Sequence, residues 1–155
     1  MTLTGSRLEQ LLTYEPETGV FRWRGGQKKV SAGMIAGSTD KDGYINICID
    51  QRMYKAHRLA WLWVMGSWPK EQIDHINGAK SDNRICNLRE ASHKQNAHNR
   101  QRRGYYLDKR RNAYVAVIVV DGQRVHLGQF KTEKEAGEAH HAAARMHHGK
   151  FARAA

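Results

Sequence analysis

The chain has 155 residues, 40 % of them hydrophobic, and a formal net charge of +11, with 26 lysine and arginine residues against 15 acidic ones. This length suits one ordinary domain or two small ones, and the longest apolar stretch, residues 59–65, is too short to span a membrane. Basic residues are spread along the whole chain, which favours a long surface that meets a polyanion. A merely soluble basic protein is the alternative. Cys48 and Cys86 lack C-x-x-C spacing and the N-terminus shows no signal-peptide pattern, so we expect a soluble intracellular protein without a zinc knuckle or disulfide framework.

The first region, residues 1–70, is predicted to form a small sheet with helices. The expected elements are a short helix with Leu8, Leu11 and Leu12 on one face and a capping box at residues 6–9, strands at 20–24 and 44–49, a turn at Asp50 and Gln51, and a helix at 56–65 ending at Gly66. All four tryptophans lie in this region. We expect them to pack in the core, and base stacking by one of them is the alternative.

The last region, residues 104–155, is predicted to form three strands followed by one helix. The expected elements are strands at 104–107, 114–120 and 124–130, a hairpin turn at Asp121 and Gly122, and a helix capped by Thr132 and Glu135 that reaches His148 and stops at Gly149. Small residues on one face of that helix suit close packing against a sheet. Together the regions predict an α+β fold whose C-terminal part is a three-stranded antiparallel sheet on one helix.

The chemistry-bearing residues cluster between Asp74 and Asn96, in a region we bound at residues 71–103. A strand at 72–76 carries Asp74 and His75, which point to opposite faces because side chains alternate along a strand. One can therefore hold a metal while the other addresses water. A polar loop follows, and a capping box at residues 92–95 opens a helix toward Arg103 that carries Asn96. A turn-rich surface loop without chemistry is the alternative.

This cluster resembles the HNH (His-Me finger, ββα-metal) endonuclease family. The matching residues are Asp74, His75, Ile76, Asn77 and Gly78, then Asn83, Arg84, Asn87, Leu88 and Asn96, with supporting similarity at residues 57–61 and 66–69. Within that family these residues are most similar to phage and intron-encoded homing endonucleases, and the resemblance covers roughly residues 44–99. It implies a chain that acts in the cytoplasm of a bacterial or phage-infected host cell.

The resemblance implies a role for each residue of the cluster. His75 would be the general base that deprotonates water, Asn87 would position it, and Asp74 and Asn96 would bind a single Mg²⁺ or Mn²⁺. The products would be 5′-phosphate and 3′-hydroxyl ends, and one site per chain implies nicking. Other residues of the region keep open roles: His93 and His98 are rival ligands, which we interpret as solvated or phosphate-facing, and Asn83 and Arg84 brace the loop or touch phosphate.

Residues 102–151 resemble the Apetala-type plant DNA-binding domain, which also occurs appended to HNH homing endonucleases. The resemblance rests on residues 103–105, 114–116, 124–130 and 132–136. It implies DNA contacts by Arg103, Tyr106, Arg124 and His126. The middle strand departs from the family, because Val115, Val117 and Val119 stand where charged or polar residues are usual. These valines could touch thymine methyl groups, pack against the nuclease region or form a dimer surface.

The resulting prediction is a DNA endonuclease acting on double-stranded DNA, with Arg84, Arg100, Arg102 and Arg103 as further phosphate contacts. Residues 1–70 would be a DNA-contacting region, 71–103 the catalytic motif and 104–155 the DNA-reading domain. We expect a monomer, with a dimer as the alternative, and no membrane partner. A DNA-binding regulator on an HNH scaffold is the second function, and an RNA-binding or RNA-cleaving protein is the third.

Overall fold

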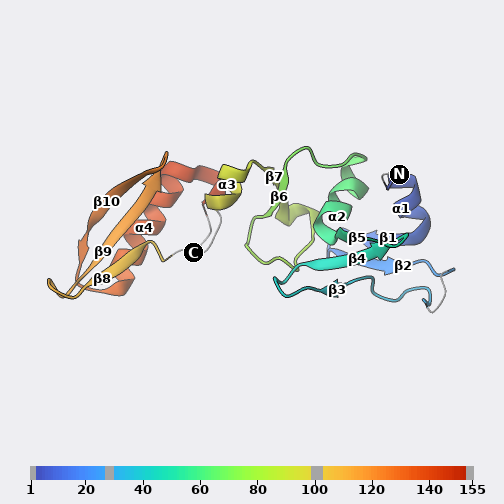
Figure 1. Cartoon of the computed structure of the whole chain (residues 1–155), viewed down its shortest axis with the longest axis horizontal. Coiled ribbons are helices and arrows are strands. Elements are labelled where there is room, and N and C mark those ends of the chain that lie inside the picture. The colour runs from blue at the N-terminus through green and yellow to red at the C-terminus, as the bar shows by residue number, and fades with distance from the viewer. Residues whose placement is uncertain (1–2, 27–29, 99–102, 153–155) are drawn as a thin grey trace. The chain divides into compact units, whose positions relative to one another are not determined.

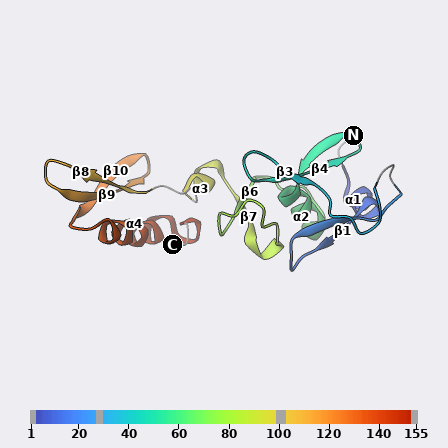
Figure 2. The ribbon, with the colours of Figure 1, turned by 90° about the horizontal axis from the view of Figure 1, so that it is seen from below.

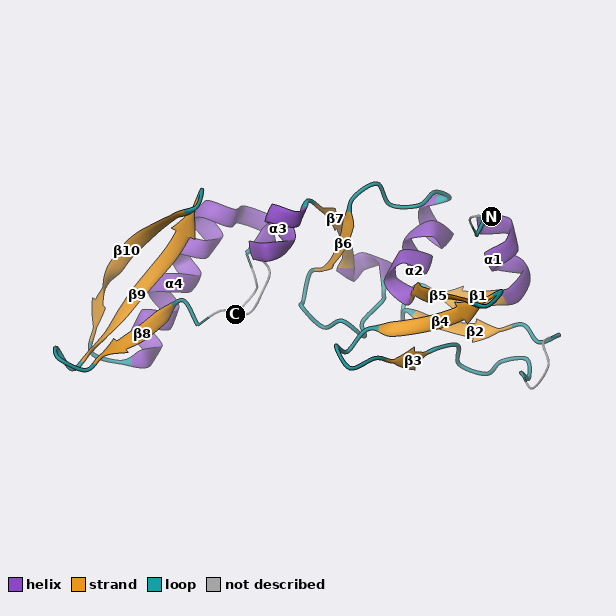
Figure 3. Ribbon diagram, in the orientation of Figure 1, coloured by secondary structure: helices purple, strands orange, loops and turns teal. Residues whose placement is uncertain are grey.

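The computed structural model describes residues 3–26, 30–98 and 103–152. Contacts divide the chain into two compact units, Met1–Ser92 and His93–Ala155. Both units combine helices with small antiparallel sheets (Figure 3), which confirms the predicted α+β class. No helix of the described ranges is long and apolar enough to cross a membrane.

In its described residues, the first unit contains three small sheets and two α-helices (Figure 1). Its elements are α1 (Gly5–Leu11), β1 (Leu12–Glu15), β2 (Val20–Trp23), β3 (Ser38–Thr39), β4 (Ile45–Ile49), β5 (Arg52–Lys55), α2 (Ala56–Met65), β6 (Gln72–His75), the 3₁₀ turn η1 (Ile85–Asn87) and β7 (Leu88–Ala91). The sheets pair β1 with β2, β3 with β4 and β5, and β6 with β7. The predicted helix at 56–65 is confirmed, and Gly66 ends it in the left-handed conformation (φ 71°), which glycine adopts without steric cost.

The core of the first unit lies between α1, α2 and the strands around them. Its most buried large side chains are Leu8, Leu12, Ile47, Ile49 and Leu59. The four tryptophans are partly buried and pack against this core, which supports the core-packing interpretation. Their indoles therefore report on the folding of this unit.

The start of α1 differs from the prediction. The N-cap is Thr4, whose Oγ1 accepts a hydrogen bond from the Arg7 N–H at 3.2 Å, so the capping box expected at residues 6–9 is wrong. Leu12 is extended (φ −126°) and begins β1. It reaches the core from a strand, although the apolar spacing alone assigned it to the helix.

The second unit is a three-stranded antiparallel sheet with one long helix against one face (Figure 2). Its elements are α3 (His93–His98), β8 (Tyr105–Asp108), β9 (Ala113–Val120), β10 (Gln123–Phe130), α4 (Glu133–His148) and the 3₁₀ turn η2 (Gly149–Phe151). The strand order is β10-β9-β8. These bounds confirm the three predicted strands and the predicted helix. The predicted extension of α3 toward Arg103 lies partly outside the described residues.

Local signals set the ends of α4 and of the β9–β10 hairpin. Thr132 Oγ1 accepts from the Glu135 N–H, and the Glu135 carboxylate accepts from the Thr132 N–H, which is the predicted capping box. Asp121 and Gly122 both have positive φ angles (51° and 82°), as a tight hairpin turn requires. Ala136 on α4 is fully buried, so the small-residue face does lie against the sheet.

Candidate active site

The β6–β7 hairpin positions the two central residues of the site. Antiparallel pairing sets Asp74 opposite Arg89 and His75 opposite Leu88. Asp74 and His75 are only 5 % and 4 % exposed. The sequence predicted that these side chains leave the strand on opposite faces. The structure adds that both are buried, in separate environments.

Asp74 is held by a buried ion pair that the sequence did not predict. Arg89 donates from Nε and Nη2 to Asp74 Oδ2, at 2.8 Å and 2.6 Å. The Arg89 side chain is only 13 % exposed. A buried carboxylate needs such a partner, because an uncompensated charge inside a protein is strongly destabilising. Arg89 therefore fixes the orientation of this carboxylate.

The His75 ring lies among two other rings and one amide. The His57 ring meets it edge-on, with the two centroids 5.0 Å apart, and the Tyr44 ring centroid is 6.0 Å away. Its Nε2 is 3.4 Å from Asn83 Oδ1. Burial lowers the pKa of His75 below the ordinary 6.5, although the hydrogen bond with Asn83 opposes this shift. The imidazole is therefore neutral near pH 7 and able to accept a proton.

His57 is a part of this site that the sequence analysis did not assign a role. It lies in the first turn of α2, is 7 % exposed, and its Nδ1 has no hydrogen-bond partner in the part of the chain that the structure describes. Burial, and then the neighbouring His75, lower its pKa to about 3. It is thus a neutral ring against the candidate base. His57 precedes Asp74, the first predicted site residue, by 17 positions in the sequence, and only the packing of α2 brings it next to His75.

The loop between β6 and β7 is held by its own asparagines. The side chain of Asn87 accepts from the Asn77 N–H at 3.0 Å and donates to the Asp82 carbonyl at 2.9 Å. Asn83 is 1 % exposed and donates to the Ser81 carbonyl at 3.2 Å. The Arg84 guanidinium binds the Asp82 carboxylate at 2.8 Å and 2.6 Å. Asn83 and Arg84 thus make the bracing contacts that were one of their two predicted roles.

A close approach from the N-terminal turn supports this loop. The Tyr14 hydroxyl donates to the Asn83 carbonyl at 2.7 Å. A Cβ atom at Gly19 would lie 2.4 Å from the Arg84 nitrogen, so only glycine fits there. The segment around β1 and β2 therefore buttresses the loop beside His75.

Asn96 lies in α3, in the second unit, as does His93. Its pairing with Asp74 at one metal therefore stays a prediction. The side chain of His98 and the residues Arg100 and Arg102 lie outside the described part of the chain. Nevertheless, the donor chemistry fits a hard cation, because a carboxylate and an amide oxygen are ligands that Mg²⁺ and Mn²⁺ accept.

The predicted DNA contacts of the second unit share one face of its sheet. The register pairs Tyr106 with Val115, His126 with Val117, and Arg124 with Val119, and paired residues project from the same face. Ala116 and Ile118, on the opposite face, are buried, where α4 covers the sheet (Figure 2). Tyr106, Arg124 and His126 are exposed, as is Arg103 at the start of the unit.

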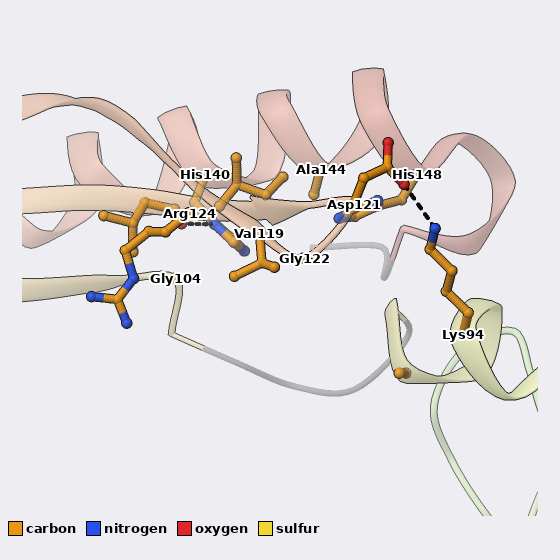
Figure 4. Close-up of a pocket in the computed structure, with 12 residues that line it drawn as sticks. Lys94, Gly104, Val119, Asp121, Gly122, Arg124, His140, Ala144 and His148 are labelled. Carbon is orange, nitrogen blue, oxygen red and sulfur yellow. Dashed lines mark hydrogen bonds and ion pairs between the residues drawn. The ribbon is translucent and has the colours of Figure 1, made fainter.

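The three valines behave differently along this face. Val115 is 3 % exposed, whereas Val119 is 42 % exposed. Near Val119, a cavity is lined by residues of the second unit alone, among them Lys94, Asp121, Arg124 and Ala144 (Figure 4). It contains none of the residues assigned to the base or to the metal. Because Val115 is buried, at least this valine serves packing.

Comparison with known proteins finds one family that is similar to part of the chain. Residues 54–98 match the family model described as HNH endonuclease. No curated protein and no solved structure matches the chain. The matched segment runs from β5 through α3 and contains the buried Asp74 and His75. This part of the chain is therefore similar to HNH endonucleases, which points to nuclease activity in general, and HNH nucleases generally use a divalent metal ion.

Proposed function

We propose that the chain is a divalent-metal-dependent DNA endonuclease of the homing type that nicks double-stranded DNA and leaves 5′-phosphate and 3′-hydroxyl ends. The observation that carries the proposal is the buried, neutral imidazole of His75 beside the buried carboxylate of Asp74, within the segment similar to HNH endonucleases. Hydrolysis of a phosphodiester needs a base for water and a cation near the phosphate. In this proposal His75 supplies the base, and Asp74 supplies one ligand of the cation.

His75 acts as the general base in this proposal. The Asn83 amide nitrogen donates to the Ser81 carbonyl, so its Oδ1 faces the His75 ring and can only accept. This arrangement favours a proton on Nε2, so Nδ1 carries the lone pair that a base needs to accept the proton of water. The edge of the His57 ring limits rotation of the imidazole, and Asn87 keeps the neighbouring loop in place.

Asp74 and Asn96 hold one Mg²⁺ or Mn²⁺ in this proposal. When bound, such a cation offsets negative charge that accumulates on the phosphate and the leaving oxygen. Arg89 restrains the Asp74 carboxylate in one orientation through two hydrogen bonds. Residues 71–103 then form the catalytic motif, between a DNA-contacting region at 1–70 and an Apetala-type DNA-reading domain at 104–155.

The exposed sheet face of the second unit is the proposed DNA-reading surface. Tyr106, Arg124 and His126 project from that face, and antiparallel β-ribbons fit the major groove of DNA. Arg84, Arg100, Arg102 and Arg103 add phosphate contacts. One site per chain favours nicking by a monomer, and dimerisation would permit cutting of both strands.

The test is conversion of supercoiled plasmid to nicked circles by the full chain with Mg²⁺ or Mn²⁺. We expect activity that is lost in EDTA and in His75→Ala but kept in His147→Ala, a matched change at an exposed histidine on α4. Intact DNA with a clear gel shift, on plasmid and on the source genome alike, would contradict the nuclease and favour a DNA-binding regulator.

A further inference from the structure

Two lysines converge on the ring of Tyr44 next to the candidate base. The ammonium nitrogens of Lys55 and Lys80 each lie 4.8 Å from the centre of that ring. The same ring centre is 6.0 Å from that of His75 and 5.4 Å from that of His57. Attraction between an ammonium group and the face of an aromatic ring holds such a charge in place. Both ammonium groups therefore contact the Tyr44 ring, which in turn neighbours the His75 ring.

The lysines come from different segments, and a turn joins them. Residues 40–44 form a turn in which Asp40 Oδ1 accepts from the N–H groups of Asp42 and Tyr44 at 2.9 Å and 3.0 Å. Lys80, in the loop after β6, donates from Nζ to the Asp42 carbonyl at 2.8 Å. The turn and the loop are thus fastened together beside His75, so the charge of Lys80 has a defined position.

The two charges are not compensated alike. Lys55 forms an ion pair with Asp40, and this pairing lowers the pKa of the Asp40 carboxyl well below its usual range. Lys80 donates to a neutral carbonyl, that of Asp42, and an ammonium group has three donors. Lys80 is also exposed. It therefore keeps a full positive charge and can bind an anion from solvent.

We propose that Lys80 and Tyr44 form a phosphate-binding subsite, with Lys55 and Asp40 as its support, that holds a backbone phosphate of DNA next to His75. The proposal deepens the function proposed above and rests on it. Lys80 supplies the charge, and the Tyr44 ring sets where that charge lies. The subsite would keep the strand in register with the base, so its loss should weaken binding and slow nicking together.

The first experiment measures DNA binding by the full chain in EDTA, where chemistry is absent. A labelled duplex is titrated by fluorescence anisotropy at several salt concentrations, with Lys80→Gln, Lys80→Arg and Lys41→Gln. Each phosphate contact contributes about 0.9 to the slope of log affinity against log salt on B-DNA. We expect Lys80→Gln to lower the slope by about this amount and Lys80→Arg to keep it. Lys41→Gln removes the same charge from an exposed position in the same turn and should change the slope less.

The subsite is overturned if the salt slope of Lys80→Gln equals that of the wild type. It is also overturned if Lys41→Gln lowers the slope as much as Lys80→Gln does, because that result indicates diffuse attraction. Tryptophan fluorescence checks the fold, because all four indoles lie in the first unit. If Lys80→Gln melts early, Tyr44→Leu against Tyr44→Phe tests the same subsite, with a lower slope expected only for Tyr44→Leu. Equal slopes for this pair would overturn it.

The outcomes separate this subsite from the nuclease itself. A wild type that nicks, with Lys80→Gln binding and nicking equally well, leaves the nuclease standing and overturns the subsite. If the wild type never nicks DNA but binds it with a salt slope that depends on Lys80, the nuclease proposal is rejected and the phosphate contact is supported. In an active wild type, we expect single-turnover nicking at saturating protein to fall at least about tenfold in Lys80→Gln, the loss of about 1.4 kcal/mol.

Discussion

Replacing Arg89 by methionine removes the cation from the buried pair with Asp74 and keeps most of the side-chain volume. The carboxylate is 5 % exposed and would lose both hydrogen bonds from the guanidinium. Breaking a buried pair by removing one partner costs about 3–5 kcal/mol. In a unit the size of Met1–Ser92, this loss lowers the melting temperature by at least about 12 °C, at about 4 °C or more per kcal/mol.

Arg7→Met is the matched control, because Arg7 in the same unit also donates from Nε and Nη2 to one aspartate, reaching the two carboxylate oxygens of Asp50 at 3.1 Å and 2.9 Å. That pair is about half exposed, so solvent screens it and its loss should change stability little. Thermal melts of both variants, followed by tryptophan fluorescence, compare the pairs directly. If Arg89→Met melts within a few degrees of Arg7→Met, burial does not make the Arg89–Asp74 pair more costly to break than the exposed Arg7–Asp50 pair.

Three further predictions follow from the histidines and one glycine. Since burial lowers the pKa of His75 below 6.5, the base form persists into mild acid, and the single-turnover nicking rate should hold down to about pH 6.5; a rate that halves above that pH contradicts this. His57 has a pKa of about 3 in the folded chain and an ordinary value of 6.5, so between pH 3 and 6.5 the unfolded chain binds more protons than the folded one. The free energy of unfolding should therefore fall as the pH is lowered through this range, by up to about 1.4 kcal/mol per pH unit. Urea denaturation of His57→Phe should show a shallower fall, and an unchanged one refutes the assignment. Gly104→Ala should destabilise the second unit more than Gly122→Ala in circular-dichroism melts, because both have positive φ but only the Gly104 Cβ would strike His140, at 2.1 Å; equal losses contradict the clash.

Local chemistry made most elements predictable from the sequence. Gly66, the Asp121 and Gly122 turn, and the Thr132 capping box each act within a few residues, and the structure has each where it was predicted. The same holds for the alternation that separates Asp74 from His75. Such signals need no knowledge of what the segment packs against.

The parts of the site that escaped prediction depend on register and packing. Arg89 faces Asp74 only because β6 and β7 pair in one register, and a shift by one residue would turn it to the other side. His57 reaches His75 only because α2 packs near the hairpin, and Lys80 meets Tyr44 across a loop and a turn. Thr4 displaced the capping box expected at residues 6–9, because two competing caps stand within one turn and local pattern alone does not rank them.

The charge balance connects these internal pairs with a polyanionic partner. Many of the described aspartates bind a cation of the same chain; they include Asp40, Asp50, Asp74, Asp82 and Asp121. Each such pair uses one positive and one negative charge and leaves the excess of positive charge unchanged. Even if all 15 acidic residues paired one to one, 26 minus 15 would leave 11 lysines and arginines without an acidic partner in the chain. Those excess charges repel one another and attract a polyanion, so binding to DNA should weaken steeply with salt. Lys80, whose carbonyl partner leaves its charge intact, is one of the cations that this excess makes available beside His75.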